Sequence, residues 1–260
     1  MSDFDVFKKE FYQLTKVNLD LYKEEQLKRR LENFISKNKI SEFKNFSDLT
    51  LKMKKSKELQ DVIEEYITIN VTEFLRNKNM WDILLNEMIP KISKNKTKIQ
   101  IWSAACSTGE EPYTLAILMK EKFPKIDFEI LATDLDKTVL EKAKNGVYKN
   151  QSLIPFENVV ISKYFNKVDQ NHSIVTSDIK KHIKFMKHNL LEDAFSNQKD
   201  LIICRNVLIY FKEETKEVIY ERFNRSLNDE GILMIGSTEQ IYKAENHNFK
   251  SIKPFFYQKM

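Results

Sequence analysis

The sequence predicts an α/β protein in which a mostly parallel sheet follows an N-terminal all-helical domain. Two observations predict this fold. Residues 1–66 contain neither glycine nor proline, and apolar residues recur there at helical spacing. From residue 99 onward, short apolar runs typical of strands alternate with helical patterns, which favours a parallel sheet. A chain of 260 residues is long enough for one large domain or two smaller ones.

Three amphipathic segments predict the helical domain. Their apolar positions are Phe4, Phe7, Phe11 and Leu14, then Leu27, Leu31, Phe34 and Ile35, and finally Leu59, Val62, Ile63 and Tyr66. We interpret these stripes as core contacts. The polar side of the second segment carries Lys23, Lys28, Arg29 and Arg30. This charged side is either a solvated face or a docking surface for an acidic helical partner.

Residues 99–120 predict a buried strand, a tight turn of small residues and an amphipathic helix. Small side chains at positions 104–107 and Gly109 would let a ligand approach the backbone closely. Ser107 with Glu110, and Thr108 with Glu111, each fit a capping box that opens the helix. A strand, a small-residue turn and a helix N-terminus together are typical of a nucleotide-type binding loop, although a plain strand–helix turn is the alternative.

The charge at this turn indicates the kind of ligand. Only Gly109 is a glycine, so the dinucleotide pattern G-x-G-x-x-G is not matched. Glu110 and Glu111 bring two carboxylates, which suit a cation better than a phosphate. S-adenosylmethionine, with its sulfonium and amino groups, is such a cation. Asp134 ends the next strand, 25 residues after Gly109, where nucleotide-binding α/β folds place a carboxylate on the ribose hydroxyls.

The remaining elements are predicted in chain order. A helix capped by Asp136 ends at Asn145-Gly146, and a helix covers residues 213–227. We expect strands at 183–186, 200–204 and 232–235, a turn at 228–231, and an edge strand near 255–257. Between these elements, at about 149–182, the alternation lapses and a small antiparallel hairpin is expected.

Composition excludes several classes of protein. The net charge is only +5, so nucleic-acid binding is not indicated. No apolar run reaches the length of a membrane span, and the N-terminus is unlike a signal peptide, so we expect a cytoplasmic protein. Cys106 and Cys204 are too few for a disulfide framework, and the four histidines form no metal-ligand spacing. We therefore expect reduced thiols and no metal.

Six motifs occur in the order found in one family. They are Asn70-Val-Thr-Glu-Phe-Leu-Arg76, Trp102-Ser-Ala-Ala-Cys-Ser-Thr-Gly-Glu-Glu-Pro-Tyr113, Ala132-Thr-Asp-Leu-Asp136, Asn189-Leu-Leu191, Cys204-Arg-Asn-Val-Leu-Ile-Tyr-Phe211 and Gly236-Ser-Thr-Glu239. The chain resembles the chemotaxis receptor methyltransferases, the CheR family, over nearly its whole length. The resemblance implies a Rossmann-like class I S-adenosylmethionine-dependent methyltransferase sheet over residues 69–260. It also implies an all-helical domain over 1–68 and a small antiparallel β insertion at about 149–182.

The resemblance also implies a reaction. A methyl group passes from S-adenosylmethionine to glutamate side-chain carboxylates of chemoreceptors, giving glutamyl methyl esters and S-adenosylhomocysteine. The partner would be the cytoplasmic helical region of the receptors, with no nucleic acid and no membrane insertion. A glutamate with a pKa of about 4.3 is ionised at neutral pH, so no general base is needed and the enzyme supplies alignment.

Site residues follow from the matching motifs. Asn70, Thr72 and Arg76 would reach the methionine end and sulfonium side of the cofactor, Glu111 its amino group, Asp134 the ribose, and Asn189 with Leu190 the adenine. Ala104, Arg205 and Asn206 complete the expected cofactor-binding set. Arg205 and Tyr210 would place the substrate carboxylate, and are the expected catalytic residues; without the resemblance they would be a salt-bridged arginine and a core tyrosine. Lys28, Arg29 and Arg30 form the expected docking face.

Two other functions stay open at this point. One is a nucleic-acid base methyltransferase, against which stand the low net charge and the absence of an Asn-Pro-Pro-Tyr or Asp-Pro-Pro-Tyr run. The other is a cofactor sensor or scaffold that keeps the fold without the chemistry, against which Arg205 and Tyr210 argue.

Overall fold

The computed structural model describes residues 1–37, 43–68 and 70–260. The chain forms two compact units. The first consists of residues Met1–Ile69 together with Ile209–Lys216, and the second of Asn70–Leu208 with Glu217–Met260. The domain boundary expected after residue 68 falls at Ile69, which lies outside the described residues.

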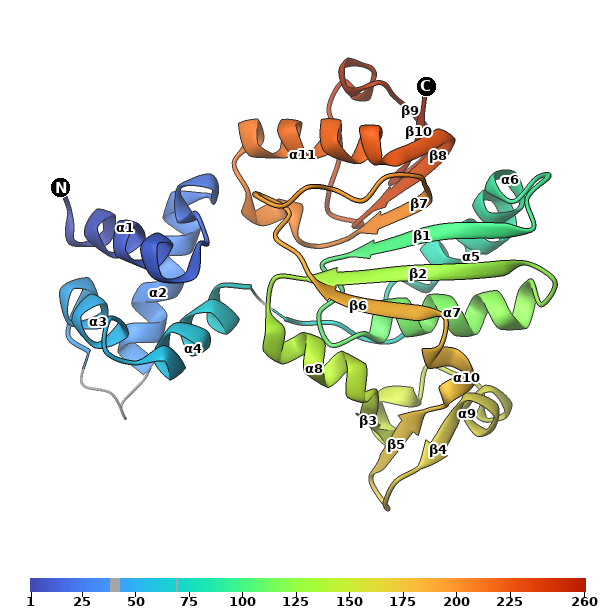
Figure 1. Ribbon diagram of the computed structural model, residues 1–260, viewed down its shortest axis with the longest axis horizontal. Coiled ribbons are helices and arrows are strands. Elements are labelled where there is room, and N and C mark those ends of the chain that lie inside the picture. The colour runs from blue at the N-terminus through green and yellow to red at the C-terminus, as the bar shows by residue number, and fades with distance from the viewer. Residues whose placement is uncertain (38–42, 69) are drawn as a thin grey trace. The chain divides into compact units, whose positions relative to one another are not determined.

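The first unit is helical (Figure 1). Its elements are α1 (Asp3–Thr15), the short 3-10 turn η1 (Leu19–Leu21), α2 (Glu24–Lys37), α3 (Phe46–Met53) and α4 (Lys57–Thr68). A capping box between Ser2 and Asp5 opens α1. Phe4 and Phe7 then pack on Phe46 of α3, and all three side chains are buried.

The apolar stripes predict most of this core, with two errors. Phe4, Phe7, Phe11, Leu27, Leu31, Phe34 and Ile63 are buried. Leu14 and Val62 are exposed, because each lies at the margin of its helix's apolar face. Helix α3 was not predicted, since eight residues are too few to establish a helical period.

The segment 209–216 completes the first unit from a distant part of the sequence. Tyr22 packs edge-on against Phe211, with ring centroids 5.0 Å apart. The Lys23 amide donates to the Tyr210 carbonyl at 2.9 Å, and the Lys212 amide to the Leu21 carbonyl at 3.0 Å. Together with the Thr215 hydroxyl, which donates to the Leu21 carbonyl at 3.2 Å, these contacts hold the segment beside η1 and the start of α2.

The second unit is built on a seven-stranded sheet with the order β6-β2-β1-β7-β8-β10-β9. The strands are β1 (Lys98–Ala104), β2 (Asp127–Asp134), β6 (Ile183–Lys187), β7 (Lys199–Cys204), β8 (Leu227–Ile235), β9 (Phe249–Lys253) and β10 (Phe256–Lys259). The first five in the order pair in parallel, and β10 runs antiparallel to both of its neighbours. The predicted mostly parallel sheet is confirmed.

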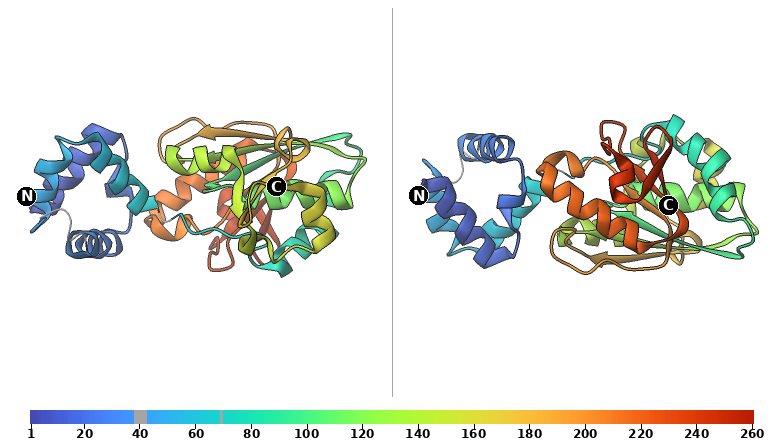
Figure 2. Two further views of the ribbon diagram at one scale, coloured as in Figure 1. Left: turned by 90° about the horizontal axis from the view of Figure 1, so that it is seen from below. Right: turned by 90° about the horizontal axis from the view of Figure 1, so that it is seen from above.

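Helices pack on both faces of this sheet, which can be followed in Figure 2. They are α5 (Lys78–Ile83), the π turn η2 (Leu84–Met88), α6 (Ile89–Ile92), α7 (Glu110–Lys122), α8 (Lys137–Asn145) and the part of α11 (Glu213–Ser226) from Glu217 onward, with the 3-10 turn η5 (Ala244–His247). The 3-10 turn η4 (Leu208–Tyr210) belongs to the first unit from Ile209 onward. Trp102 of β1 contacts Phe223 of α11. Ile101, whose side chain points to the other face, shares a core with Leu115 and Ile117 of α7.

A second, three-stranded antiparallel sheet has the order β3-β5-β4. Its elements are β3 (Val147–Lys149), η3 (Asn150–Leu153), α9 (Asn158–Tyr164), β4 (Phe165–Lys167), β5 (His172–Val175) and α10 (Ser177–Lys180). Asp169 accepts hydrogen bonds from the amides of Asn171 and His172 and so closes the β4–β5 turn. The predicted small antiparallel insertion is present.

Two details of the C-terminal region differ from the prediction. Residues 228–231, expected as a turn, lie within β8, where the register with β7 shifts between Lys199 and Leu201. The predicted edge strand is β10, which lies inside the sheet, and β9 forms the edge. The chain reverses between them at Pro254 and Phe255, where proline is a residue that tight turns favour and Phe255 has a positive φ of 68°.

Candidate functional site

The carboxyl ends of four adjacent strands lie at one edge of the sheet. Ala104 at the end of β1 pairs with Thr133 of β2 and Cys204 of β7, and Cys204 pairs with Ile235 of β8. The chain leaves β1 toward β2 on one side, whereas β7 lies on the other side. Such a point, where strand order reverses, is where open α/β sheets bind their ligands.

The loop after β1 has an unusual backbone. Ala105, Ser107 and Gly109 all have positive φ values, of 62°, 49° and 95°. Neighbouring β2 holds this conformation, because the Cys106 amide donates to the Thr133 carbonyl at 2.9 Å and the Ser107 amide to Asp134 Oδ2 at 2.8 Å. Two non-glycine residues in the left-handed region are a form of strain that occurs at ligand-binding loops.

Neither predicted capping box forms at the start of α7. Gly109 occupies the N-cap position and has no side chain to donate or accept. The Thr108 hydroxyl instead donates to Oε2 of Glu110 at 2.7 Å. The Ser107 hydroxyl is buried and has no hydrogen-bond partner among the described residues. The pattern fitted a capping box, but the left-handed turn at Gly109 moves both hydroxyls away from the helix amides.

Asp134 at the end of β2 organises the loop after β1. Its Oδ2 accepts the Ser107 amide, and its Oδ1 accepts the Asp136 amide at 3.1 Å. Burial raises the pKa of Asp134 to about 6, although both amide hydrogen bonds favour the charged form. Asp136 caps α8, as predicted, and its Oδ2 also accepts the side-chain amide of Asn70 at 2.9 Å.

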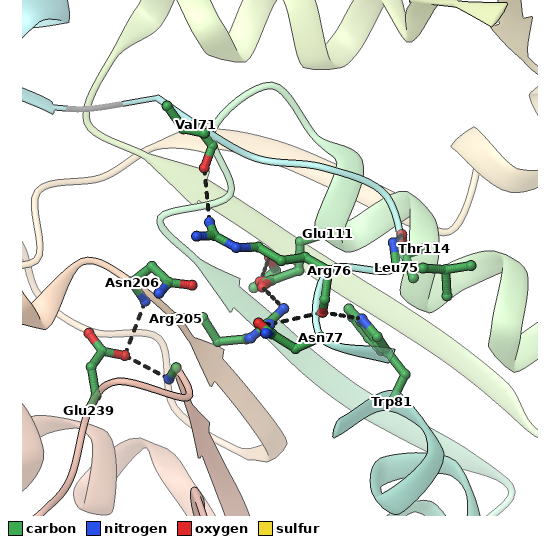
Figure 3. Close-up of polar contacts among 12 residues, drawn as sticks. Val71, Leu75, Arg76, Asn77, Trp81, Glu111, Thr114, Arg205, Asn206 and Glu239 are labelled. Atoms are coloured by element: carbon green, nitrogen blue, oxygen red, sulfur yellow. Dashed lines mark hydrogen bonds and ion pairs between the residues drawn. The ribbon is translucent and has the colours of Figure 1, made fainter. Parts of the chain in front are cut away.

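Arg205, directly after β7, forms a buried ion pair with Glu111 of α7 (Figure 3). Its Nη1 lies 3.4 Å from Glu111 Oε2, while Nη2 donates to the Arg76 carbonyl at 3.0 Å and to Asn77 Oδ1 at 2.7 Å. The Ser103 hydroxyl donates to the other Glu111 oxygen at 2.8 Å. Burial raises the pKa of Glu111, and the Arg205 charge opposes that rise.

The segment 70–77 folds against these residues. The Arg76 guanidinium donates to the Val71 carbonyl at 3.1 Å, and the Leu75 amide donates to the Thr114 hydroxyl at 3.3 Å (Figure 3). The Trp81 indole donates to the Arg76 carbonyl at 3.1 Å. Thr72 in this segment is half-buried. The structure therefore brings Asn70 and Arg76 beside Asp136 and Arg205 respectively.

The loop after β7 depends on Glu239, to which the sequence assigned no role. Asn206 adopts a left-handed conformation, with a φ of 60°. Its amide donates to Glu239 Oε2 at 3.0 Å, and the Leu208 amide donates to Oε1 at 2.9 Å. Glu239 was visible as the last residue of the Gly236–Glu239 motif, which was the only sequence signal for it.

The loop after β6 contains the two residues expected at the adenine. The His188 amide donates to the Asp134 carbonyl at 2.9 Å, which brings this loop to the end of β2. Asn189 and Leu190 are buried. The Asn189 side-chain oxygen accepts the Leu191 amide at 3.0 Å, forming a local turn.

The remaining expected residues belong to the first unit. Tyr210 is half-buried in the segment 209–216. Lys28 and Arg29 are exposed on α2. Arg30 is engaged within the unit, because its guanidinium donates to the carbonyls of Tyr66 and Ile67 in the last turn of α4. The sequence did not predict this helix-capping interaction, which depends on how α2 and α4 pack.

The charges of the second unit's site fit a cationic polar ligand. Glu111, Asp134 and Glu239 are carboxylates with little solvent exposure, and Arg205 is the cation paired among them. The Arg205 Nε and the Ser107 hydroxyl are buried without hydrogen-bond partners among the described residues, as polar groups at a ligand site often are. S-adenosylmethionine, which carries sulfonium and amino groups, fits this set of donors and acceptors.

A mostly parallel sheet with a carboxylate-rich site at its switch point is typical of class I S-adenosylmethionine-dependent methyltransferases. Two family models match the chain: "CheR methyltransferase, all-alpha domain" over residues 2–66 and "CheR methyltransferase, SAM binding domain" over 70–256. The chain therefore belongs to the CheR methyltransferase family, which confirms the resemblance.

Curated relatives agree with this assignment. The chain is 39% identical over 244 residues to a chemotaxis protein methyltransferase of Listeria innocua, covering 94% of this chain and 92% of the relative. It is 35% identical over 256 residues to a chemotaxis protein methyltransferase of Borreliella burgdorferi, covering 94% and 89%. It is 31% identical over 254 residues to chemotaxis protein methyltransferase 2 of Vibrio cholerae, covering 94% and 88%.

No helix in residues 1–37, 43–68 and 70–260 combines the length and the apolar character that crossing a bilayer requires.

Proposed function

We propose that the chain transfers the methyl group of S-adenosylmethionine to glutamate side-chain carboxylates in the cytoplasmic helical region of chemoreceptors. The products are glutamyl methyl esters and S-adenosylhomocysteine. The observation that carries the proposal is family membership over both parts of the chain, combined with the Glu111–Arg205 pair at the strand ends. The proposed setting is the cytoplasm, without nucleic acid. Residues 1–68 would serve docking, and 69–260, with the insertion at about 149–182, would serve methyl transfer.

The bound cofactor supplies an electrophilic methyl group on its sulfonium. Asp134 would accept the ribose hydroxyls, because each of its oxygens uses one lone pair on a backbone amide and keeps another. Glu111 would accept the amino group in the same way, beside its bonds to Ser103 and Arg205. The other proposed contacts are Asn70, Thr72 and Arg76 to the methionine end, Asn189 and Leu190 to the adenine, and Ala104, Arg205 and Asn206 along the strand ends.

The substrate carboxylate needs alignment more than activation. A glutamate with an ordinary pKa of about 4.3 is already a nucleophile at neutral pH, so the chain need not remove a proton. Three contacts lock the Arg205 guanidinium and leave its Nε as a free donor among the described residues. That donor would hold one carboxylate oxygen while the other faces the methyl carbon. Tyr210 is the second proposed contact to the substrate.

Substituting Arg205 or Tyr210 should lower turnover more than it lowers cofactor affinity. Tyr210→Phe and Arg205→Lys should each lower kcat for receptor methylation by at least about tenfold, because a misaligned nucleophile loses part of the advantage of orientation. Their affinities for S-adenosylhomocysteine, measured by calorimetry, should change much less. Tyr242→Phe is the matched control, since Tyr242 is 76% exposed. Equal losses in turnover and cofactor affinity would contradict the assignment.

The docking proposal rests on Lys28 and Arg29, which are exposed on α2. Reversing both to glutamate should raise the KM for a receptor fragment at least about threefold at low salt, because charge steering is lost and acidic surfaces repel. The control reverses the exposed Lys9 and Lys55, which changes the net charge equally. Arg30 stays unchanged, because it binds the end of α4. The same KM in both double variants would exclude this face.

The deciding experiment is transfer of label from methyl-labelled S-adenosylmethionine to a chemoreceptor cytoplasmic fragment, followed by mild alkali. Release of volatile labelled methanol is expected, because carboxyl methyl esters hydrolyse under these conditions. Alkali-stable label on the protein would indicate nitrogen methylation and contradict the proposal. Tight cofactor binding with no transfer, across several receptor fragments, would favour a sensor or scaffold.

A further inference from the structure

Glu239, in the loop after β8, has no part in the binding or transfer steps proposed above. Its side chain is 6% exposed. Besides the amides of Asn206 and Leu208, its carboxylate accepts the Gly236 amide at 2.6 Å. Gly236 follows β8, whereas Asn206 and Leu208 follow β7, so one carboxylate joins the loops of two neighbouring strands (Figure 3).

The fit around this carboxylate is close. A Cβ at Gly236 would lie 2.6 Å from Glu239 Oε2 and 2.9 Å from the Asn206 amide nitrogen, which is nearer than such atoms approach. Asn206 is also held at a positive φ, and its amide is one of the three donors. The direction of the chain just after Arg205 is therefore set by Glu239.

The orientation of this turn matters because Arg205 immediately precedes it. Arg205 lies beside Glu111, and its buried Nε has no hydrogen-bond partner among the described residues. A rotation at Asn206 would redirect the Arg205 backbone, while the Glu111, Arg76 and Asn77 contacts resist that movement at the tip of the side chain. Glu239 thus fixes the backbone end of the Arg205 side chain, whereas Glu111, Arg76 and Asn77 hold its guanidinium group.

The Glu239 charge also acts on the site. It raises the pKa of Glu111, in the same direction as burial, whereas Arg205 and the Ser103 hydroxyl lower that pKa. Burial raises the pKa of the Cys106 and Cys204 thiols, and nearby carboxylates, among them Glu111, raise both further, so the thiols stay neutral. Glu239 therefore has an electrical effect on Glu111 that a neutral side chain of the same shape would lack.

We propose that Glu239 is a positioning residue for methyl transfer: its carboxylate fixes the turn after β7, and through that turn the placement of Arg205 and Asn206. This inference rests on the proposed function of the same site. It adds a residue that would contact neither cofactor nor substrate.

The test is the variant Glu239→Gln, which keeps the size of the side chain. An amide group must present its NH₂ to at least one of the three backbone amides, so one donor loses its acceptor. We expect kcat for receptor methylation to fall about ten- to a hundredfold, with the KM for S-adenosylmethionine within about threefold. Glu245→Gln is the matched control, because Glu245 is exposed in η5, and it should leave both constants unchanged.

A pH profile separates positioning from a purely structural role. Glu239→Gln removes a charge that raises the pKa of Glu111 and also displaces Arg205, whose charge lowers that pKa, so the pH at which S-adenosylhomocysteine affinity is lost on acidification should move. If Glu239→Gln changes neither the pH dependence of S-adenosylhomocysteine affinity nor kcat, the inference is overturned. So would a loss of kcat matched by equal losses of cofactor affinity and thermal stability, because that pattern describes damage to the fold alone.

A measurement on the unchanged chain covers the case in which Glu239→Gln fails to fold. Hydrogen exchange at the Asn206 and Leu208 amides should slow at least about tenfold when S-adenosylhomocysteine is added, since a turn that places site residues should tighten when the site is filled. Unchanged exchange would overturn the inference. If the wild type methylates no receptor glutamate, the proposed function fails. The pH dependence of S-adenosylhomocysteine affinity and the exchange of the Asn206 and Leu208 amides still decide the role of Glu239.

Discussion

The loops after β1 and β7 both contain a left-handed turn, but carboxylates at different places hold the two turns. Each places a non-glycine residue in the left-handed region, Ser107 in one and Asn206 in the other, and each is held by a buried carboxylate that accepts backbone amides. Asp134 holds the first loop from the end of the adjacent strand, and Glu239 holds the second from the loop beyond its adjacent strand. Asp134 accepts one amide from the loop that it holds, whereas Glu239 accepts two.

This difference separates a carboxylate that can bind a ligand, Asp134, from one that holds the backbone, Glu239. Asp134 accepts one amide on each oxygen, which leaves capacity for ligand hydroxyls, and its pKa is raised to about 6. Glu239 accepts three amides from two loops. A carboxylate with spare lone pairs can serve a ligand, whereas one surrounded by amides mainly sets backbone direction. The comparison predicts that pH affects the first loop through Asp134 and that the Glu239 carboxylate controls the backbone of the second.

The largest expected effect is the pH dependence of stability contributed by Asp134. Its folded pKa of about 6 exceeds the ordinary 3.8, so between these values the folded state holds a proton that the unfolded state has released. This contribution is full below about pH 4 and is lost as pH rises through 6. The free energy of unfolding of the wild type, relative to Asp134→Asn, should fall by about 2.5 kcal/mol from pH 4 to 7.

Urea unfolding of both proteins across this pH range checks the prediction. Asp229→Asn, which changes an exposed carboxylate, serves as the control and should show no such slope. If the difference in the free energy of unfolding between wild type and Asp134→Asn does not vary with pH, folding does not raise the pKa of Asp134.

The next effect concerns Gly109, in the loop after β1, and Gly236, which follows β8 and contacts the loop after β7. Gly236→Ala should destabilise by about 1–3 kcal/mol, because its Cβ would lie 2.6 Å from Glu239 Oε2. In a Glu239→Ala background this penalty should shrink by at least about 1 kcal/mol, since the oxygen is gone. Gly109→Ala should be equally costly in both backgrounds, because its φ of 95° and the Tyr148 hydroxyl 2.9 Å away cause the strain.

A double-mutant cycle by chemical denaturation measures these terms. If Gly236→Ala loses the same stability with and without the Glu239 carboxylate, the close approach of these two residues does not account for the requirement for glycine.

The smallest expected effect is the relief of backbone strain. Ser107→Gly should raise the free energy of unfolding by up to about 1 kcal/mol, because serine at a φ of 49° is strained and its buried hydroxyl lacks a partner among the described residues. Asn206→Gly should gain nothing, because asparagine tolerates this conformation through local hydrogen bonding. Equal changes in thermal midpoint for the two variants would remove this distinction between the loops.

Sequence reasoning found the features that follow from local patterns. Alternating strands and helices predicted the parallel sheet, and Asp136 and Gly146 were identified as the boundaries of α8 because capping chemistry is local. The resemblance brought in Arg205 and the segment 70–77. Charge and strand position pointed to Glu111 and Asp134 without it.

The features that were missed depend on the folded arrangement. Arg30 caps α4 across 36 residues of sequence, and Glu239 meets Asn206 across 33. The capping boxes at Ser107 and Thr108 were wrong, because the left-handed backbone of Gly109 decides where α7 begins. No period or motif within a short window encodes these contacts, since they arise only when distant segments pack.

The segment 209–216 determines how this protein can be divided for experiments. Tyr22 packs on Phe211, and the backbone beside η1 is hydrogen-bonded to residues 210 and 212. A gene fragment ending near codon 68 would encode all four of α1–α4 but would lack these partners, leaving an aromatic ring and two backbone groups uncovered. An isolated helical unit for binding studies therefore requires residues 209–216 to be supplied, for example by a short fused linker and peptide.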